Sequence, residues 1–200
     1  MEAILHGIIL AFGLILPLGV QNVFVFSQGA TQPKLHRALP AAITAGVCDT
    51  LLILLAIFGL SVIVLQFEWL RIMLMITGII FLLYMGYAIW RSEPAKNNTN
   101  QALSIRQQII FALSVSLLNP HAILDIVGVI GTSALKYVGT EQLFFTVACI
   151  LVSWIWFFGL MVAGAVMKKL DGTGLIMIIF NKASAIFIWA TALYLFSGLV

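Results

Sequence analysis

The stretch Leu117-Leu118-Asn119-Pro120-His121-Ala122-Ile123-Leu124-Asp125 lies inside an apolar run that is long enough to cross a lipid bilayer. It places an amide, a proline, an imidazole and a carboxylate where hydrocarbon is expected, and each of these is costly in lipid. Polar residues inside membrane segments usually face a cavity or a partner. We therefore expect this stretch to break a membrane helix and to form part of a polar site near the middle of the membrane.

A similar interruption lies at residues 16–22, Leu-Pro-Leu-Gly-Val-Gln-Asn. Pro17 removes a helix hydrogen bond and Gly19 loosens the backbone. Gln21 and Asn22 can satisfy the backbone groups that are freed, or a ligand can. A simple proline kink with packing amides is the alternative. Pro17, Gly19 and Pro120 are the predicted hinges of two broken helices.

The composition identifies an integral membrane protein. Of the 200 residues, 62% are hydrophobic and 8% are charged, whereas soluble domains contain about 25% charged residues. A spanning helix needs ~20 apolar residues, so we expect an all-α fold of six transmembrane helices in a single transmembrane domain. The predicted spans are residues 3–26, 38–64, 70–90, 107–131, 142–167 and 175–199. The first span is expected to be retained, because no Lys or Arg precedes residue 34 to form the basic region of a signal peptide.

The basic residues predict the orientation of the chain. Seven lie in the loops between spans 1 and 2, 3 and 4, and 5 and 6, and two lie on the other side. The positive-inside rule puts the first set in the cytoplasm and both termini outside. The seven are Lys34, Arg37, Arg91, Lys96, Arg106, Lys168 and Lys169; the two are Arg71 and Lys136. Basic residues in these positions do not indicate nucleic-acid binding.

A polar linker at residues 91–106 divides the chain into repeats of three spans, residues 3–90 and 107–199. An odd number of spans in each half gives the halves opposite orientations, which is the inverted-repeat arrangement of many secondary transporters. Pro17 and Pro120 are 103 residues apart, and so are Asn22 and Asp125. We expect a site at the interface of the repeats; chance alignment in a biased composition is the alternative.

Asp49 and Asp125 are the only acids inside the predicted spans. Few basic partners lie at their depth, so the pair favours a cationic ligand or a shared proton, with a carboxylate hydrogen-bonded to amides as the alternative. Trp154 could stack on a cation or simply pack. His121 could relay protons, bind metal or donate to a freed carbonyl.

Other chemistry has little support. Cys48 and Cys149 lie in apolar runs and do not form an extracellular disulfide framework. The sequence has no phosphate-binding Gly-Lys-Ser/Thr loop, nucleophile elbow or zinc ligand pair at helical spacing. We expect no ATP-driven pump, no enzyme, no cofactor and no resident metal.

Several of these residues resemble a known family. Residues 16–25, Leu-Pro-Leu-Gly-Val-Gln-Asn-Val-Phe-Val, followed by Gln28-Gly29, resemble the first-span motif of the LysE/ArgO family of basic amino-acid exporters. Asp49 stands where the family has an acid in span 2. The motifs that match the later spans are Leu118-Asn119-Pro120-His121 with Leu124-Asp125, Trp154-Ile155-Trp156-Phe157, and Asn181. The chain departs at Val20, where the family usually has proline, and at Lys182, where it has an apolar residue.

The resemblance covers essentially the whole chain and implies export of L-arginine, L-lysine or both across the cytoplasmic membrane of a bacterium. Asp49 and Asp125 are expected to hold the cation and to carry a proton in antiport. Gln21, Asn22 and Asn119 are expected to hold the rest of the amino acid, with Trp154 beside it.

Three rival functions remain. The first is export of threonine or homoserine, although the exporters of these amino acids lack the Leu-Asp pair. The second is export of a heavy-metal cation through Cys48, Asp49, His121 and Cys149. The third is a thiol–disulfide electron carrier that uses the two cysteines. The expected partners are the substrate, protons and the lipid bilayer, without nucleic acid. Small residues that permit close helix packing, within or between chains, leave a homo-oligomer open; they are Gly78, Gly86, Gly159 and Gly164.

Overall fold

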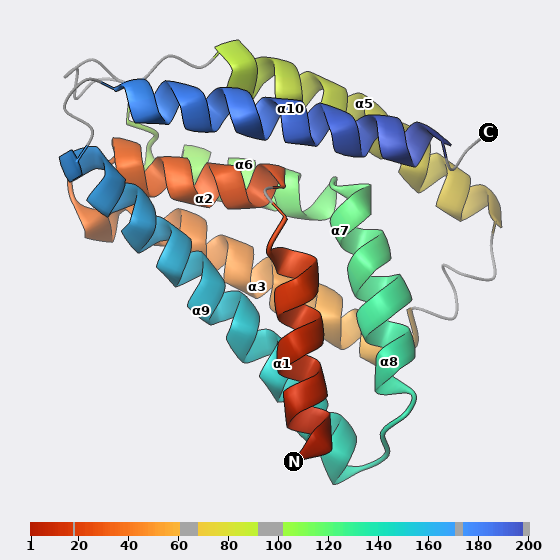
Figure 1. The fold of residues 1–200 in the computed structure, drawn as a ribbon. Coiled ribbons are helices and arrows are strands. Elements are labelled where there is room, and N and C mark those ends of the chain that lie inside the picture. The colour runs from red at the N-terminus through yellow and green to blue at the C-terminus, as the bar shows by residue number, and fades with distance from the viewer. Residues whose placement is uncertain (18, 61–67, 92–101, 171–173, 198–200) are drawn as a thin grey trace.

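The computed structural model of the chain describes residues 1–17, 19–60, 68–91, 102–170 and 174–197. The described residues form helices joined by short turns (Figure 1), as the all-α prediction requires. In chain order the elements are α1 (Glu2–Ile15), α2 (Val20–Thr31), η1 (Leu35–Ala38), α3 (Leu39–Leu55), η2 (Ala56–Leu60), α5 (Glu68–Arg91), α6 (Ile105–Leu117), α7 (Pro120–Asp125), η4 (Ile126–Gly131), α8 (Thr132–Ala134), α9 (Thr140–Leu170) and α10 (Leu175–Ser197). Most of the predicted linker, residues 92–101, lies outside the described residues.

The first predicted span is broken at the predicted position. α1 and α2 are bent by 80° relative to each other. Pro17 has no backbone N–H to donate, and carbonyl groups at the break need donors from elsewhere. Gly19 N donates to the carbonyl oxygen of Pro17 at 2.7 Å. Asn22 Nδ2 donates to the carbonyl oxygens of Ile15 at 2.7 Å and Pro17 at 2.8 Å. These bonds make the break tolerable in an apolar environment.

The second predicted break separates α6 from α7. α6 ends at Leu117, Asn119 has an extended backbone, and Pro120 begins α7, a position where the missing N–H costs nothing. The chain then continues through η4, a segment with π-helical hydrogen bonding, into α8. A second π-helical segment, η2, follows α3 and packs against η4.

The long helix α9 packs against α1, α2 and α3. The contact with α2 is a close crossing of two backbones. A Cβ atom on Gly29 would collide with the carbonyl oxygen of Met161, and one on Gly164 with that of Phe26. Glycine at these positions allows the helices to approach, as is common in membrane proteins.

α5 and α10 form an antiparallel pair that covers α2 and α6 (Figure 1). Gly86 on α5 leaves room for the indole of Trp189 on α10, whose Nε1 donates to the carbonyl oxygen of Leu83 at 3.3 Å. Lys182 of α10 donates to the carbonyl oxygen of Trp90 at 3.0 Å and lies 3.8 Å from the centre of its ring. The unusual lysine therefore ties α10 to the end of α5.

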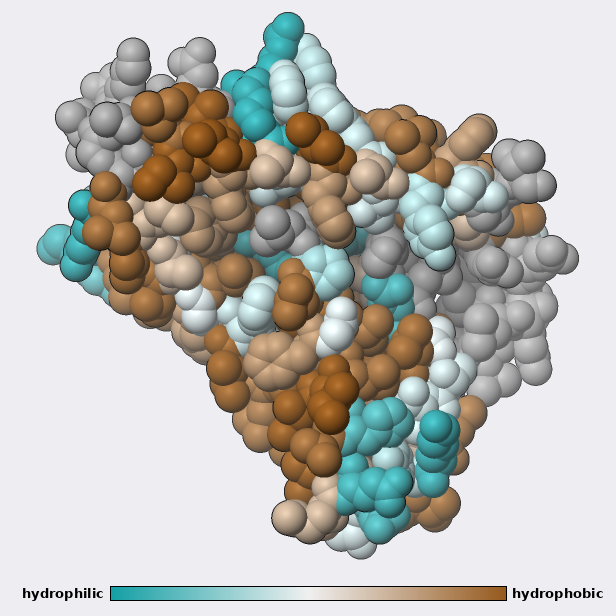
Figure 2. Space-filling model, viewed as in Figure 1, coloured by the Kyte–Doolittle hydropathy of each residue, from teal (hydrophilic) through white to brown (hydrophobic). Residues whose placement is uncertain are grey.

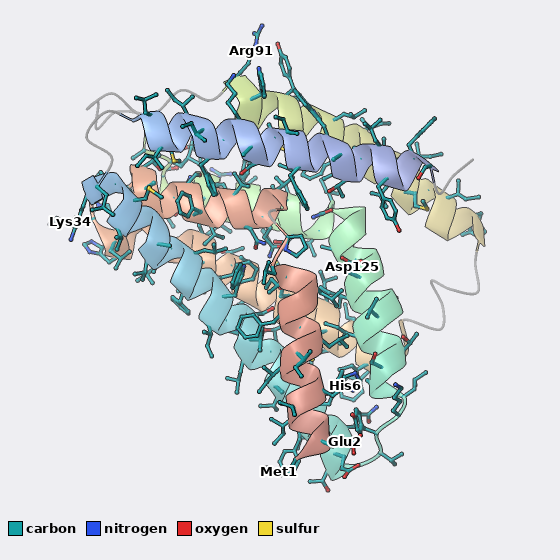
Figure 3. All side chains as sticks on the ribbon, viewed as in Figure 1. Met1, Glu2, His6, Lys34, Arg91 and Asp125 are labelled. Atoms are coloured by element: carbon teal, nitrogen blue, oxygen red, sulfur yellow. The ribbon has the colours of Figure 1, made fainter. Side chains whose placement is uncertain are left out.

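Hydrophilic side chains gather at two ends of the molecule and also at the top, around Arg91, and much of the surface between them is apolar (Figures 2 and 3). At one end, Lys168 Nζ donates to the carbonyl oxygen of Gln32 at 2.9 Å, which brings two of the predicted cytoplasmic loops together near Lys34 (Figure 3). At the other end, the Tyr137 hydroxyl lies 2.9 Å from His6 Nδ1. Desolvation and the carboxylates of Glu2 and Glu141 raise the pKa of Tyr137, so its hydroxyl stays protonated there.

Within the described residues, three helical segments are long and apolar enough to cross a membrane, namely Leu35–Phe58, Thr140–Leu170 and Leu175–Ser197. The bent pair α1–α2 gives a fourth candidate if it counts as one span. The apolar helices Met75–Arg91 and Ile105–Leu117 are shorter. Six spans arranged as two inverted repeats therefore stay a prediction.

Candidate functional site

A cavity of about 100 Å³ lies where the two broken helices meet. It is bounded by Pro17 and Gly19 at the first break and by Asn119 at the second. α1, α2, α3, α5, α7, α9 and α10 each contribute side chains to its wall. The polar side chains among them are Gln21, Asn22, Asp49, Asn119, Asp125, Ser153 and Thr191.

Asp49 projects from α3 and is 6% exposed. Gln21 Nε2 donates to its Oδ1 at 3.1 Å, and Ser153 Oγ donates to its Oδ2 at 2.8 Å. These donors come from α2 and α9, so the carboxylate joins three helices. A carboxylate has about four acceptor sites and these two neutral donors occupy two of them, which leaves capacity for a further donor.

Asp125 and Asn119 reach the same cavity from the second broken helix. Asp125 is half-buried at the end of α7, in the middle of the molecule (Figure 3). Asn119 is 6% exposed, and its Oδ1 has no hydrogen-bond partner among the described residues. An unpaired buried acceptor is costly and calls for an explanation. Among the described residues no Lys or Arg lines the cavity, whereas two carboxyl groups do.

The donors of the first break are largely used within the protein. Asn22 Nδ2 bonds to two backbone carbonyls, and Asn22 Oδ1 accepts from Trp156 Nε1 at 3.3 Å. The N-terminus of α2 supplies donors instead. Gly19 is its N-cap and lines the cavity, and the first N–H groups of any helix lack partners inside the helix. The positive end of the α2 dipole thus lies at the cavity wall.

Five of the six predicted substrate contacts therefore line one cavity: Gln21, Asn22, Asp49, Asn119 and Asp125. The sixth, Trp154, does not. Its Nε1 donates to Thr50 Oγ1 at 3.0 Å, its ring stacks on Phe158, and it packs over Gly46 of α3. Trp154 thus contributes to the packing of α9 on α3, beside the site.

The cysteines have different surroundings. Both thiols are free and buried. Cys149 lines the cavity, with its Sγ 3.6 Å from the carbonyl oxygen of Gly7. Among the described side chains, which do not include His121, no group of three or more His, Cys, Asp or Glu residues is arranged to hold a metal ion.

Sequence reasoning missed Ser153 and Thr191. Their only signal is a hydroxyl in the middle of an apolar span. Thr191, Thr146 and Thr50 each donate to the carbonyl oxygen four residues earlier in their own helix, at 3.0, 2.7 and 2.7 Å, whereas Ser153 donates to Asp49. The spacing of these hydroxyl residues from the other polar residues of the spans does not show which of them line the cavity.

Comparisons with known proteins agree with this picture. The family model of the LysE type translocators matches residues 12–198. The "Putative amino-acid transporter YisU" of Bacillus subtilis (strain 168) is 55% identical over 195 residues, which cover 97% of this chain and 89% of that protein. The "Arginine exporter protein ArgO" of Klebsiella pneumoniae (strain 342) is 34% identical over 165 residues, 80% of this chain and 77% of that protein. Its namesake in Escherichia coli (strain K12) is 30% identical over 195 residues, 95% of this chain and 91% of that protein. No solved structure matches the chain. The chain therefore belongs to the LysE type translocator family, and it is a membrane transporter and not an enzyme.

Proposed function

We propose that this protein is a secondary active exporter of basic amino acids, L-arginine, L-lysine or both, that works by proton antiport across the cytoplasmic membrane. The observation that carries the proposal is the set of acceptors in the central cavity. Asp49, Asp125 and Asn119 line one space, in which Asn119 Oδ1 has no hydrogen-bond partner and no Lys or Arg lines the wall among the described residues. The relatives named as arginine exporters support the same substrate class.

A guanidinium or ammonium group suits this set of acceptors. Arginine offers five N–H donors in a planar fork, and lysine offers three. A carboxylate pairs well with either, and charge-assisted hydrogen bonds are roughly twice as strong as neutral ones. A cationic side chain would satisfy Asn119 Oδ1 and neutralise a carboxylate at once, whereas a threonine side chain carries no charge and would leave the carboxylate unneutralised.

The α-carboxylate of the substrate needs donors, and the N-terminus of α2 is the nearest set. Half-helix N-termini hold substrate carboxylates in other transporters with broken helices. In this arrangement the N-terminus of α2 would hold the α-carboxylate, and Asp49 or Asp125 would hold the cationic group. Gln21 would then act mainly by orienting Asp49, to which it donates.

The central cavity is small in this conformation. About 100 Å³ is well below the roughly 300–1,000 Å³ of typical ligand pockets. It is room for a few water molecules and not for an amino acid. Transport would therefore include a step that enlarges the cavity, as alternating access requires.

Coupling to protons follows from the charge of the substrate. Moving one positive charge outward against an inside-negative potential costs about 2.3 kcal/mol per 100 mV. Exchange for one proton cancels that cost. Asp49 or Asp125 would bind the proton after the cation leaves and release it when the next cation arrives.

The test is efflux of radiolabelled L-arginine from proteoliposomes that contain the purified protein. We expect an inward proton gradient to accelerate efflux and a protonophore to remove the acceleration. Asp49→Asn and Asp125→Asn should each reduce efflux by roughly tenfold or more, because removing one partner of a buried charge pair costs about 2–5 kcal/mol. Glu141→Gln, an exposed carboxylate at one end of α9, is the matched control and should leave efflux unchanged.

A panel of L-lysine, L-threonine and L-homoserine separates the rival substrates. Efflux of threonine that exceeds that of arginine would assign the protein to neutral amino-acid export. If both aspartate variants transport at the wild-type rate, the assignment of Asp49 and Asp125 to the substrate site is wrong, whatever the substrate is.

A further inference from the structure

A second cavity, of about 260 Å³, lies between α2 and the α5/α10 pair. We call it the inner vestibule; it is lined mainly by Val20, Phe24, Ser27 and Gln28 of α2 and by Met85 and Asn181 across from them. It shares no residue with the central cavity. The role proposed for it below rests on the proposed export of amino acids.

The two cavities follow one another along the same seam between helices. On α10, Asn181 lines the vestibule, whereas Ile188 and Thr191 line the central cavity. On α2, Gln21 faces the central cavity and Thr31, near the other end of the helix, lines the vestibule. The vestibule therefore lies on the side of the molecule where the predicted cytoplasmic loops meet.

An apolar barrier separates the two spaces. Leu82 and Ile188 line the central cavity, and Val20 and Met85 line the vestibule. All four belong to one buried cluster and are at most 4% exposed. Members of the same cluster therefore face both cavities, and the barrier is built from the side chains of this one cluster.

One polar group interrupts this barrier. Ser184 is fully buried, and its hydroxyl has no hydrogen-bond partner among the described residues. It lies three residues after Asn181 and four before Ile188, so the three side chains share one face of α10. A buried hydroxyl without a partner is destabilising in this conformation, and it gains a partner if the barrier opens to a polar substrate or water.

We propose that the inner vestibule is a cytoplasmic binding site where the amino-acid substrate waits before it crosses the barrier of Val20, Leu82, Met85 and Ile188 into the central cavity. The polar groups of the vestibule are neutral: the buried amides of Gln28 and Asn181 and the hydroxyls of Ser27 and Thr31. The hydroxyls of Ser27 and Thr31 donate to carbonyl oxygens of their own helix, and Gln28 Oε1 accepts from Gln32 Nε2. Hydroxyl and amide oxygens can each accept more than one hydrogen bond, so these groups suit the ammonium of a zwitterion and bind it without the strength of a fixed charge. The carboxylates, and with them the selection for a cation, come only after the barrier.

Thiol accessibility tests the vestibule. Ser27→Cys places a thiol in it, and Ser114→Cys is the matched control, because Ser114 is also half-buried in a helix, bonds to its own backbone and lines neither cavity. The reagent is a membrane-impermeant cationic methanethiosulfonate, and the wild-type chain, with its two buried thiols, is the blank. In inside-out vesicles we expect Ser27→Cys to react at least tenfold faster than Ser114→Cys, with L-arginine slowing the reaction. In intact cells it should stay unlabelled.

The outcomes separate the two proposals. If Ser27→Cys reacts no faster than Ser114→Cys, or reacts only from outside, the inner vestibule is not a cytoplasmic binding site, even if the protein exports arginine. If it reacts from the cytoplasmic side but threonine protects it and arginine does not, the vestibule stands and the proposed substrate class fails.

Ser184→Ala tests the barrier. A hydroxyl that only lacks a partner could be removed without harm, so thermal stability would hold or rise and efflux would be unchanged, which would overturn this part of the proposal. We expect arginine efflux to fall severalfold at unchanged stability, while labelling of Ser27→Cys in the same chain keeps its rate because the vestibule lies before the barrier.

Discussion

The side chain of Asn22 bonds to the backbone at the first helix break, together with the N–H of Gly19, which donates to the carbonyl oxygen of Pro17. Its amide donates to the carbonyls of Ile15 and Pro17, and its oxygen accepts from Trp156. Inside a bilayer no water is available to replace these bonds, and each unsatisfied backbone group costs several kcal/mol. The residue is therefore a structural requirement of the break as well as a predicted contact of the substrate.

Asn22→Asp tests this role because it keeps the shape of the side chain and removes both N–H donors. We expect a lower melting temperature of the detergent-solubilised protein, together with loss of efflux. An unchanged melting temperature with lost efflux would mean that Asn22 serves the substrate and not the backbone. Gln28→Glu, on the same helix and also buried, controls for the general cost of an acid in α2.

The sequence identified the polar residues of the cavity better than it identified the side chains that hydrogen-bond to them or pack beside them. Asp49, Asp125 and Asn119 were recognisable because carboxylates and an Asn-Pro pair are costly in an apolar run. Ser153, which donates to Asp49, was not recognisable, because hydroxyls in membrane helices commonly bond to their own backbone. The position of Trp154 depends on which face of α9 meets α3, and a helix that is apolar all round does not reveal its buried face.

At the scale of elements, the crossing of α2 and α9 depends on glycine. Gly164 lies against the backbone of α2, whereas a Cβ on Gly159, five residues earlier in α9, would meet nothing within 4 Å. The two glycines thus differ in packing although they lie in the same helix.

Gly164→Ala should destabilise the protein and Gly159→Ala should not. Overpacking costs about 1–3 kcal/mol, whereas alanine favours an open helix position by about 1 kcal/mol relative to glycine. The melting temperature in detergent, measured by size exclusion after heating, should fall by several degrees for the first variant and hold or rise for the second. Equal behaviour of the two would contradict the close crossing.

The helix breaks could be predicted and the π-helical segments could not. Pro17 and Pro120 cannot donate a backbone hydrogen bond, and this property is visible in the sequence. Residues 56–60 and 126–131 consist of ordinary apolar residues and glycine. Nothing in this composition indicates a wider, π-helical turn instead of an α-helical one. The packing of η2 on η4 is a tertiary contact between distant parts of the chain.

At the scale of the whole molecule, the two polar ends predict how the protein lies in the membrane. Lys34 is exposed at one end, and Val138, 85% exposed, lies in the turn before α9 at the other. With the basic loops in the cytoplasm, an impermeant thiol reagent should label Val138→Cys in intact cells. It should label Lys34→Cys only after the membrane is permeabilised. The reverse pattern would invert the molecule and place the inner vestibule outside.

The relation of the two halves stays a prediction. Each half begins with a helix that is broken at a proline, and α5 and α10, the last helices of the two halves, pack together. The equal spacing of Pro17 to Pro120 and of Asn22 to Asp125 is what an inverted repeat would leave in the sequence. Sequence spacing gives the correspondence of the halves, but it does not give the angle at which they meet.

The bond from Trp156 to Asn22 has a mechanical consequence. Trp156 belongs to α9, the longest helix among the described residues, and Asn22 bonds to the carbonyls of Ile15 and Pro17. A tilt of α9 would therefore pull on a side-chain amide that helps to keep the joint of the first span in shape. Rigid-body rocking of a helix would in this way change the backbone that faces the cargo, and the indole would be the linkage that converts one movement into the other.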